Sequence, residues 1–198
     1  MTDLLLDTRE IRRHRERVAA GLRGELLEIG FGSGLNVAVY PSAVRSVNAV
    51  EPSLVARKMS APRVKRCGIP VDFVGIDGES LSLANDSVDA ALSTFTLCTI
   101  PNPVQALREI HRVLRPGGEF HFLEHGLSPD PSTARWQHRL NGIERRVAGG
   151  CHLDRRIDQL VTAAGLDMQA LINEQMRGPR VASPWGYLFF GIAIKRPT

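Results

Sequence analysis

The stretch Leu27-Glu28-Ile29-Gly30-Phe31-Gly32-Ser33-Gly34 decides the fold of this chain, because an apolar run leads directly into three glycines at alternate positions. A second apolar run, residues 47–50, is followed by the carboxylate of Glu51. A strand, a glycine-rich turn and a carboxylate at the end of the next strand are typical of a site for a cofactor that contains adenosine.

The spacing of the glycines favours one class of such cofactors. A dinucleotide fingerprint requires glycine at the first, third and sixth positions of the turn, but the sixth position here is Leu35 and the last glycine is Gly34. Glu28, two residues before Gly30, would repel a pyrophosphate and attract the ammonium group of S-adenosylmethionine. We therefore predict S-adenosylmethionine as the cofactor, with a dehydrogenase and a turn without ligand as the alternatives.

Further motifs follow in a fixed order along the chain. They are Glu51-Pro52-Ser53, Asp77-Gly78-Glu79, residues 87–94 and residues 108–118. From about Glu25 to its end, the chain resembles the class I methyltransferases that use S-adenosylmethionine. The resemblance implies an α/β fold with a Rossmann-like, seven-stranded, mostly parallel sheet, helices on both faces and an antiparallel last strand.

The resemblance also implies a role for each cofactor-binding residue. Glu28 would hold the amino end of the cofactor, directly or through the backbone of the turn, and the two oxygens of Glu51 suit the vicinal hydroxyls of the ribose. Asp77 and Gly78 would contact the adenine, although a plain turn is the alternative. The full predicted set is Glu28, Gly30, Phe31, Gly32, Gly34, Glu51, Pro52, Asp77, Gly78 and Thr94.

A narrower resemblance concerns the acceptor. Thr96-Leu97-Cys98, Leu123-Glu124-His125 and Gly150-Cys151-His152-Leu153 resemble the methyltransferase-like protein seven group, whose human members methylate alkyl thiols. A small lipophilic thiol is therefore the expected acceptor. Proteins of that group carry an apolar membrane segment ahead of the domain, whereas residues 1–24 here are mostly polar. We expect a cytoplasmic protein without an integral membrane segment, and peripheral membrane contact stays open.

His125 is the predicted catalytic residue. Methyl transfer from a sulfonium has a neutral leaving group, so the protein chiefly aligns the nucleophile and removes its proton. A thiol with a pKa of about 8.5 is mostly protonated at neutral pH, and His125 ends an expected strand where open α/β sheets present functional residues. A histidine that bonds locally in a loop is the alternative, and His152 is a weaker candidate for the base.

The cysteines predict neither a disulfide framework nor a metal site. Cys67, Cys98 and Cys151 are few, odd in number and widely spaced, without the close pair that metal sites show. Each is expected to be a small buried residue. Cys98 is of interest because it follows the fourth expected strand, near the place of methyl transfer.

Composition indicates one domain in 198 residues, with enough apolar side chains, 43%, for a substantial core. We expect an N-terminal helix in residues 1–24, the cofactor core in 25–124, and a substrate-side insertion with a final hairpin in 125–198. Although the net charge is +4, aromatic residues are only 6% of the chain and do not alternate with basic ones, which argues against a nucleic-acid partner. The oligomeric state stays open.

Apolar periodicity predicts the individual elements. Strands are expected over 26–29, 47–50, 71–76, 88–93, 119–124, 168–173 and 188–194. Helices are expected over 8–20, 35–40, from 54 with an interruption at Pro62, over 103–114 up to Pro116-Gly117-Gly118, and over 131–164 with a break at Gly149-Gly150. The short connection 174–187 favours an antiparallel hairpin.

Two other functions remain open at this point. Residues 108–118 are close to a segment of quinone and small-molecule methyltransferases, which indicates carbon or oxygen methylation of a quinone or phenol. A cofactor-binding scaffold without catalysis is the second alternative. The acceptor would be enclosed by Phe95, Trp136, Trp185 and Tyr187, of which Trp136 is more readily explained as core.

Overall fold

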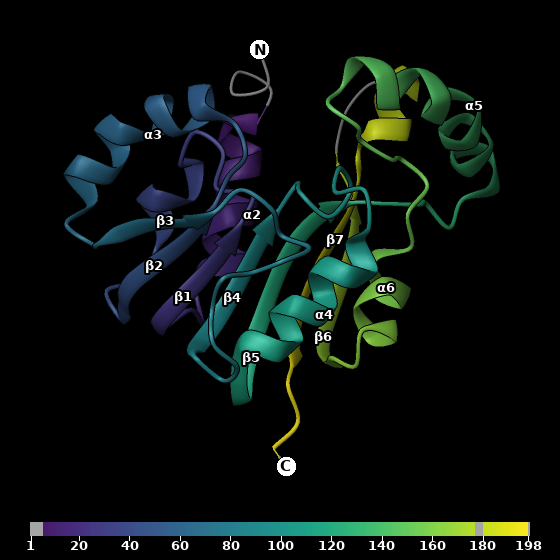
Figure 1. The fold of residues 1–198 in the computed structure, drawn as a ribbon. Coiled ribbons are helices and arrows are strands. Elements are labelled where there is room, and N and C mark those ends of the chain that lie inside the picture. Colours follow the sequence, from purple (N-terminus) through teal and green to yellow (C-terminus); the bar gives the residue numbers. More distant parts are fainter. Residues whose placement is uncertain (1–5, 177–179, 198) are drawn as a thin grey trace.

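The computed structural model describes residues 6–176 and 180–197, and its centre is a seven-stranded sheet in the order β3-β2-β1-β4-β5-β7-β6 (Figure 1). The strands are β1 (Gly24–Ile29), β2 (Val44–Val50), β3 (Val71–Gly75), β4 (Val88–Thr94), β5 (Leu114–His125), β6 (Asp167–Gln175) and β7 (Tyr187–Ile194). Strands β1 to β5 run parallel, whereas β7 lies antiparallel between β5 and β6. The predicted sheet, with its antiparallel last strand, is confirmed.

Helices cover both faces of the sheet, as predicted (Figure 1). They are α2 (Arg9–Ala19), α3 (Leu54–Cys67), α4 (Pro103–Val113), α5 (Pro131–Val147), α6 (Ile157–Ala163) and two 3-10 helices, η1 (Leu35–Val39) and η2 (Arg180–Trp185). Helices α4 and α6 lie on one face, and α2, η1 and α3 lie on the other. None of the helices in the described ranges combines the length and apolar character needed to cross a bilayer.

The sheet divides the apolar core into two clusters. Leu27 and Phe122 belong to the cluster under α4 and α6, while Leu26 and Leu123 belong to the cluster under α2 and η1. Side chains alternate between the faces of a strand, and a parallel sheet covered on both sides buries both sets. This is why central strands such as β1 and β4 are largely apolar in the sequence, whereas the edge strand β6 is mostly exposed.

The structure corrects three expected helix details. The segment expected as a helix over 35–40 is the five-residue 3-10 helix η1, because Pro41 holds the preceding Tyr40 in an extended conformation with ψ 130°. Helix α3 continues through Pro62, which therefore does not interrupt it. The carbonyl of Lys58, which Pro62 leaves without a donor, belongs to an exposed residue that water can reach.

The third correction concerns the end of α4. The helix ends at Val113 and β5 begins at Leu114, so Pro116-Gly117-Gly118 lies in the strand rather than at the end of the helix. The division of the chain at residues 24 and 124 stays a prediction.

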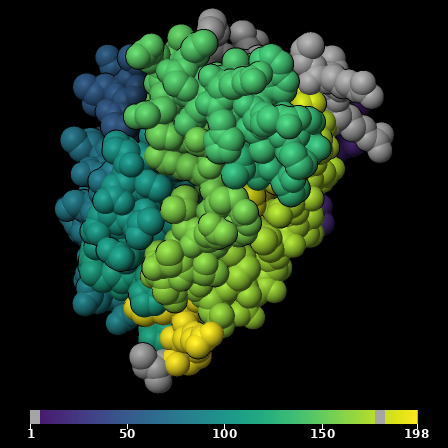
Figure 2. All heavy atoms as spheres, turned by 90° about the vertical axis from the view of Figure 1, so that its right-hand side faces the viewer, coloured from purple at the N-terminus to yellow at the C-terminus, as the bar shows by residue number. Residues whose placement is uncertain are grey.

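Helix α5 lies at one end of the molecule, above α6 and β6 (green in Figure 2). Its one fully buried residue is Gln137, whose amide donates to the carbonyls of Gly126 and Pro184, both at 3.0 Å, and accepts from the Ser128 N–H at 2.8 Å. Trp136, expected in the core, is 54% exposed because it lies on the outer side of this helix.

Candidate functional site

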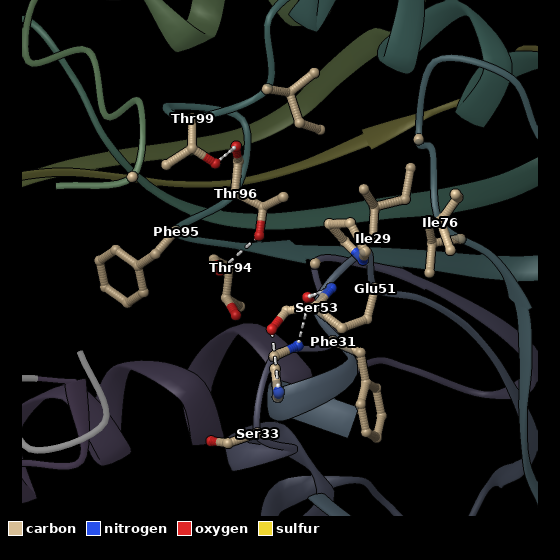
Figure 3. Close-up of a pocket in the computed structure, with 18 of the residues that line it drawn as sticks. Ile29, Phe31, Ser33, Glu51, Ser53, Ile76, Thr94, Phe95, Thr96 and Thr99 are labelled. Atoms are coloured by element: carbon tan, nitrogen blue, oxygen red, sulfur yellow. Dashed lines mark hydrogen bonds between the residues drawn. The ribbon is translucent and has the colours of Figure 1, made fainter. Parts of the chain in front are cut away.

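A cavity of about 620 Å³ opens at the carboxyl ends of the parallel strands (Figure 3). Eight of the predicted cofactor residues line it: Gly30, Phe31, Gly32, Glu51, Pro52, Asp77, Gly78 and Thr94. In Figure 3, Ile76 and Phe95 lie on opposite sides of the view, with Glu51 between them. The cavity therefore extends from the end of β3 to the end of β4.

The glycine turn needs its glycines for two different reasons. Gly30 has a φ of +76°, and a Cβ there would lie 1.9 Å from the Thr96 Oγ1. Gly32 has a φ of +57° and no side chain near it, so its backbone is open to the cavity. Gly34, also with positive φ, caps η1 and does not line the cavity. Positive φ and close approach are both readily available only to glycine.

The carboxylate of Glu51 lies between the turn and the start of α3. One oxygen accepts the Gly32 N–H at 2.7 Å, and the other accepts the Ser53 N–H at 2.8 Å. Each carboxylate oxygen can accept more than one hydrogen bond. Both oxygens thus keep acceptor capacity toward the cavity while the backbone holds the carboxylate in place.

Glu28 lies below the turn rather than in the cavity wall. It is 1% exposed, and its two oxygens accept from the Asn36 Nδ2 at 2.7 Å and from the Tyr40 hydroxyl. Burial raises the pKa of Glu28 to about 7. Asn36 does line the cavity, so Glu28 is linked to the cavity wall through this side chain and not through the backbone of the turn. Its role at the amino end of the cofactor stays a prediction.

Arg15 is a cavity residue that the sequence reasoning missed. Its side chain comes from α2, is 5% exposed, and donates to the Asn36 Oδ1 at 2.6 Å and the Thr94 Oγ1 at 2.8 Å. Its Nε has no hydrogen-bond partner among the described residues, and desolvation lowers its pKa. Arg15 follows Ile11 by four positions, which places it on the buried side of the helix. This spacing of four residues from Ile11 was the feature of the sequence that could have identified Arg15 as a buried residue.

The segment that follows β3 forms the opposite end of the cavity. A Cβ on Gly78 would lie 2.9 Å from the Ile29 Cγ2, so this segment packs directly on the end of β1. Asp77 lines the cavity, and its carboxylate also accepts the Glu79 N–H at 2.8 Å. Asp77 and Gly78 thus form a turn that also lines the cavity, and their contact with adenine stays a prediction.

Glu124 organises the turn that follows β4. Its fully buried carboxylate accepts from the Ser93 hydroxyl at 2.7 Å, the Thr96 N–H at 3.0 Å and the Cys98 N–H at 3.3 Å. Burial raises the pKa of this carboxyl group. Phe95, in the same turn, has a φ of +55°, which is uncommon for a residue with a side chain. The carboxylate holds this turn in shape.

His125, the predicted base, lies beside the cavity and not in its described wall. It is half-buried, and its ring centroid is 4.9 Å from that of Phe95, which does line the cavity. The structure brings Cys98 and Cys151 to the same place, with ligand atoms of the three residues within 4.8 Å of one another. His152 is separate from this group and lies 3.9 Å from Asp154.

Electrostatics couple the two thiols of this group. The hydrogen bond with Cys98 and the nearby His125 lower the pKa of Cys151 to about 5, whereas the same bond and burial raise that of Cys98. One thiol is therefore the donor and the other the acceptor. The three residues belong to separate segments, so the motifs that contain them do not show that their side chains converge.

Comparisons with known proteins agree with this geometry. Residues 27–122 match the family model described as a methyltransferase domain. A thiol S-methyltransferase (TMT1B) of Rattus norvegicus is 34% identical over 134 residues, which are 66% of this chain and 54% of that protein. A ubiquinone/menaquinone biosynthesis C-methyltransferase (UbiE) of Rubrivivax gelatinosus is 38% identical over 109 residues, 54% of this chain and 42% of that protein. The chain thus spans about half the length of these relatives.

The fold has well-matched counterparts among solved structures. A geranyl diphosphate methyltransferase in complex with S-adenosylmethionine superimposes with a TM-score of 0.74 over 98% of this chain and 89% of the other. Its sequence is only 12% identical, so this likeness concerns the fold alone.

Proposed function

Because this chain belongs to the class I methyltransferases, which use S-adenosylmethionine, we propose that it transfers the cofactor's methyl group to a small lipophilic thiol. The relative named as a thiol S-methyltransferase carries the choice of acceptor, since it matches over about two thirds of this chain. The apolar surroundings of Phe95 and of the two buried cysteines are consistent with an uncharged, lipophilic substrate.

The cavity offers partners for the ribose, the adenine and the carboxylate of the cofactor. We assign the ribose hydroxyls to Glu51 and the adenine to the end of the cavity lined by Ile76, Asp77 and Gly78, with Asp77 as acceptor for the amino group. The carboxylate of the methionine end would meet Arg15, whose Nε lacks a partner and whose charge is buried in the cavity wall. The negative charge of Glu28 offsets only part of the cost of burying Arg15, and a cofactor carboxylate bonded to the guanidinium would offset more of it.

Methyl transfer then takes place near the turn after β4. The acceptor sulfur attacks the methyl carbon in line, the bond between that carbon and the sulfonium breaks, and its electron pair returns to the cofactor's sulfur. The protein has to hold the two sulfur atoms on one line and to favour the thiolate. We assign the second task to His125, which lies against the cavity-lining Phe95.

Methylation of a quinone or phenol is the second candidate. It is favoured by the likeness to the menaquinone-pathway C-methyltransferase and by residues 108–118. In the structure these residues form α4 and the start of β5, away from the cavity mouth. They support the fold more than the choice of acceptor, so we rank this candidate second.

Methyl-labelled S-adenosylmethionine and a matched panel of acceptors test the proposal. Alkyl thiols of increasing length should yield methyl thioethers by mass spectrometry, while the alcohols of the same chain length should yield nothing. Turnover of phenols or hydroquinones without any thiol would select the second candidate. Cofactor binding by calorimetry with no turnover of any acceptor would indicate a scaffold.

A further inference from the structure

The cluster of Cys98, His125 and Cys151 has the composition of a metal centre. We propose that these three residues bind one zinc ion beside the cavity and leave its fourth coordination position for the sulfur of the acceptor. The three ligand atoms lie within 4.8 Å of one another. Thiolate and imidazole are the ligands that zinc prefers, and two thiolates balance its charge.

The distances suit a tetrahedral ion. With Zn–S bonds of about 2.3 Å and Zn–N bonds of about 2.0 Å, ligand atoms around zinc lie about 3.5–3.8 Å apart. The upper limit of 4.8 Å therefore requires side-chain movement of about 1 Å at most. Rotation about χ1 of a cysteine or histidine supplies such a movement without backbone rearrangement.

The surrounding contacts hold the ligands in place. The Glu124 carboxylate accepts the Cys98 N–H, and the His152 N–H donates to the Cys98 carbonyl at 2.7 Å, which ties the two cysteine segments together. Cys98 is 1% exposed and Cys151 is 7% exposed, and they pack with Leu153. A rigid and dry shell of this kind is what fixes ligand orientation at metal centres.

The number of ligands indicates the kind of site. Structural zinc sites use four protein ligands, whereas catalytic sites use three and keep one position for water or substrate. Within residues 6–176 and 180–197, no fourth histidine, cysteine or carboxylate joins this group. The site is therefore of the catalytic kind, and the cluster lies next to Phe95, Thr99 and Gly149 of the cavity wall.

This role of the fourth position rests on the proposed function. A thiol that binds the ion loses its proton to solvent and is held as a thiolate at neutral pH. The thiolate sulfur then forms the bond to the methyl carbon, and the carbon–sulfonium bond breaks to give S-adenosylhomocysteine. In this arrangement His125 acts on the acceptor as a zinc ligand.

Metal content tests the site without reference to activity. The full chain, purified with reductant from zinc-supplemented cells, should contain about one zinc per chain by mass spectrometry of its metals. Cys98→Ala, His125→Ala and Cys151→Ala should each reduce this content at least tenfold. Cys67→Ala, at the one other cysteine, should leave it unchanged, since Cys67 bonds only within its own segment.

Cobalt provides a readout that needs no variant to fold. Replacement of zinc by Co²⁺ in the wild-type protein should give thiolate-to-cobalt charge-transfer absorption and the intense visible bands of a tetrahedral site. The proposal would be overturned by a wild-type protein that takes up neither metal. It would also be overturned by a Cys98–Cys151 disulfide in protein freshly purified under reducing conditions.

The outcomes for site and function are separable. Thiol methylation that survives full removal of metal would leave the proposed function intact and refute the role of the ion. One bound zinc per chain without any thiol turnover would refute the proposed acceptor and leave the site intact. With both correct, chelation should abolish thiol turnover, zinc should restore it, and affinity for S-adenosylhomocysteine should not change.

Discussion

The carboxylate of Glu51 accepts the Gly32 N–H at 2.7 Å, and this bond joins the end of β2 to the glycine turn after β1. The residue that should hold the ribose therefore also fixes the turn that should pass under it. Glu51 thus serves both cofactor recognition and the shape of the turn. Variants of Glu51 must separate its effect on cofactor binding from its effect on the turn.

Glu51→Gln should weaken binding of S-adenosylhomocysteine by about 10–150-fold. The amide keeps the shape and one acceptor but loses a charge-assisted contact of about 1.5–3 kcal/mol. Calorimetry measures the change, with Glu16→Gln on the exposed side of α2 as the control. An affinity equal to wild type would remove Glu51 from the ribose site, and tight binding of NAD by the wild type would contradict the cofactor assignment.

Arg15→Met should act on one end of the cofactor only. The variant keeps the length of the side chain and loses its charge, so binding of S-adenosylhomocysteine should fall about tenfold or more. Binding of 5′-methylthioadenosine, which lacks the amino-acid end, should stay within about twofold of wild type. Equal losses for the two ligands would mean that Arg15 only shapes the cavity. Arg17→Met, on the exposed side of the same helix, is the matched control.

Glu28→Gln should change how stability depends on pH. The pKa of Glu28 is about 7 in the folded protein, and its ordinary value, 4.5, applies to the unfolded chain. Between pH 4.5 and pH 7 the folded protein therefore keeps a proton that the unfolded chain has lost. The stabilising contribution is complete below pH 4.5 and is lost as the pH rises through 7. Glutamine imitates the protonated acid, so the variant should match wild type at pH 4.5 and exceed it by up to about 3 kcal/mol at pH 8.

Urea denaturation between pH 4.5 and pH 8 provides the test of Glu28, because the difference between the two proteins cancels the other titrating groups. Parallel curves for variant and wild type would show that burial does not disturb this carboxyl group.

Two glycine-to-alanine variants should move stability in opposite directions. Gly30→Ala places a Cβ 1.9 Å from the Thr96 Oγ1 at a φ of +76°, so a loss of about 2–5 kcal/mol is expected. Gly142 is an exposed residue in the middle of α5, and a Cβ added there would point into open space. Gly142→Ala should therefore raise the free energy of unfolding by about 0.5–1 kcal/mol. Denaturant midpoints measure both. A Gly30→Ala protein as stable as wild type would contradict the described turn.

The sequence was informative wherever one local segment carries the information. Most of the strands contain a short apolar run, because helices cover both faces of the central part of the sheet, so the seven strands and their order along the chain could be predicted. The glycine turn, Glu51 and Asp77 each follow a strand, and parallel strands bring their carboxyl ends to the same edge. That rule accounts for the eight predicted cofactor residues that line the cavity.

Residues joined only by tertiary packing could not be found in this way. Arg15 meets Thr94 across 79 positions, and Cys98, His125 and Cys151 come from a loop, a strand end and a second loop. Wide spacing predicts no metal site, but spacing cannot reveal ligands that tertiary packing brings together from separate segments. Pro62 was misjudged for another reason, since the energetic cost of a proline depends on whether the freed carbonyl reaches water.

The attachment of α5 by Gln137 has a consequence for local stability. Apart from one bond to Asn141 and the packing of Leu140, three hydrogen bonds to the Gln137 amide hold this helix. It leaves Trp136, Ile143 and Val147 in solvent, so its separation from the domain uncovers little apolar surface. Water replaces each bond at a net cost of about 0.5–1.5 kcal/mol. Backbone amides in α5 should therefore exchange with deuterium through local opening, well before those of β5 exchange through global unfolding.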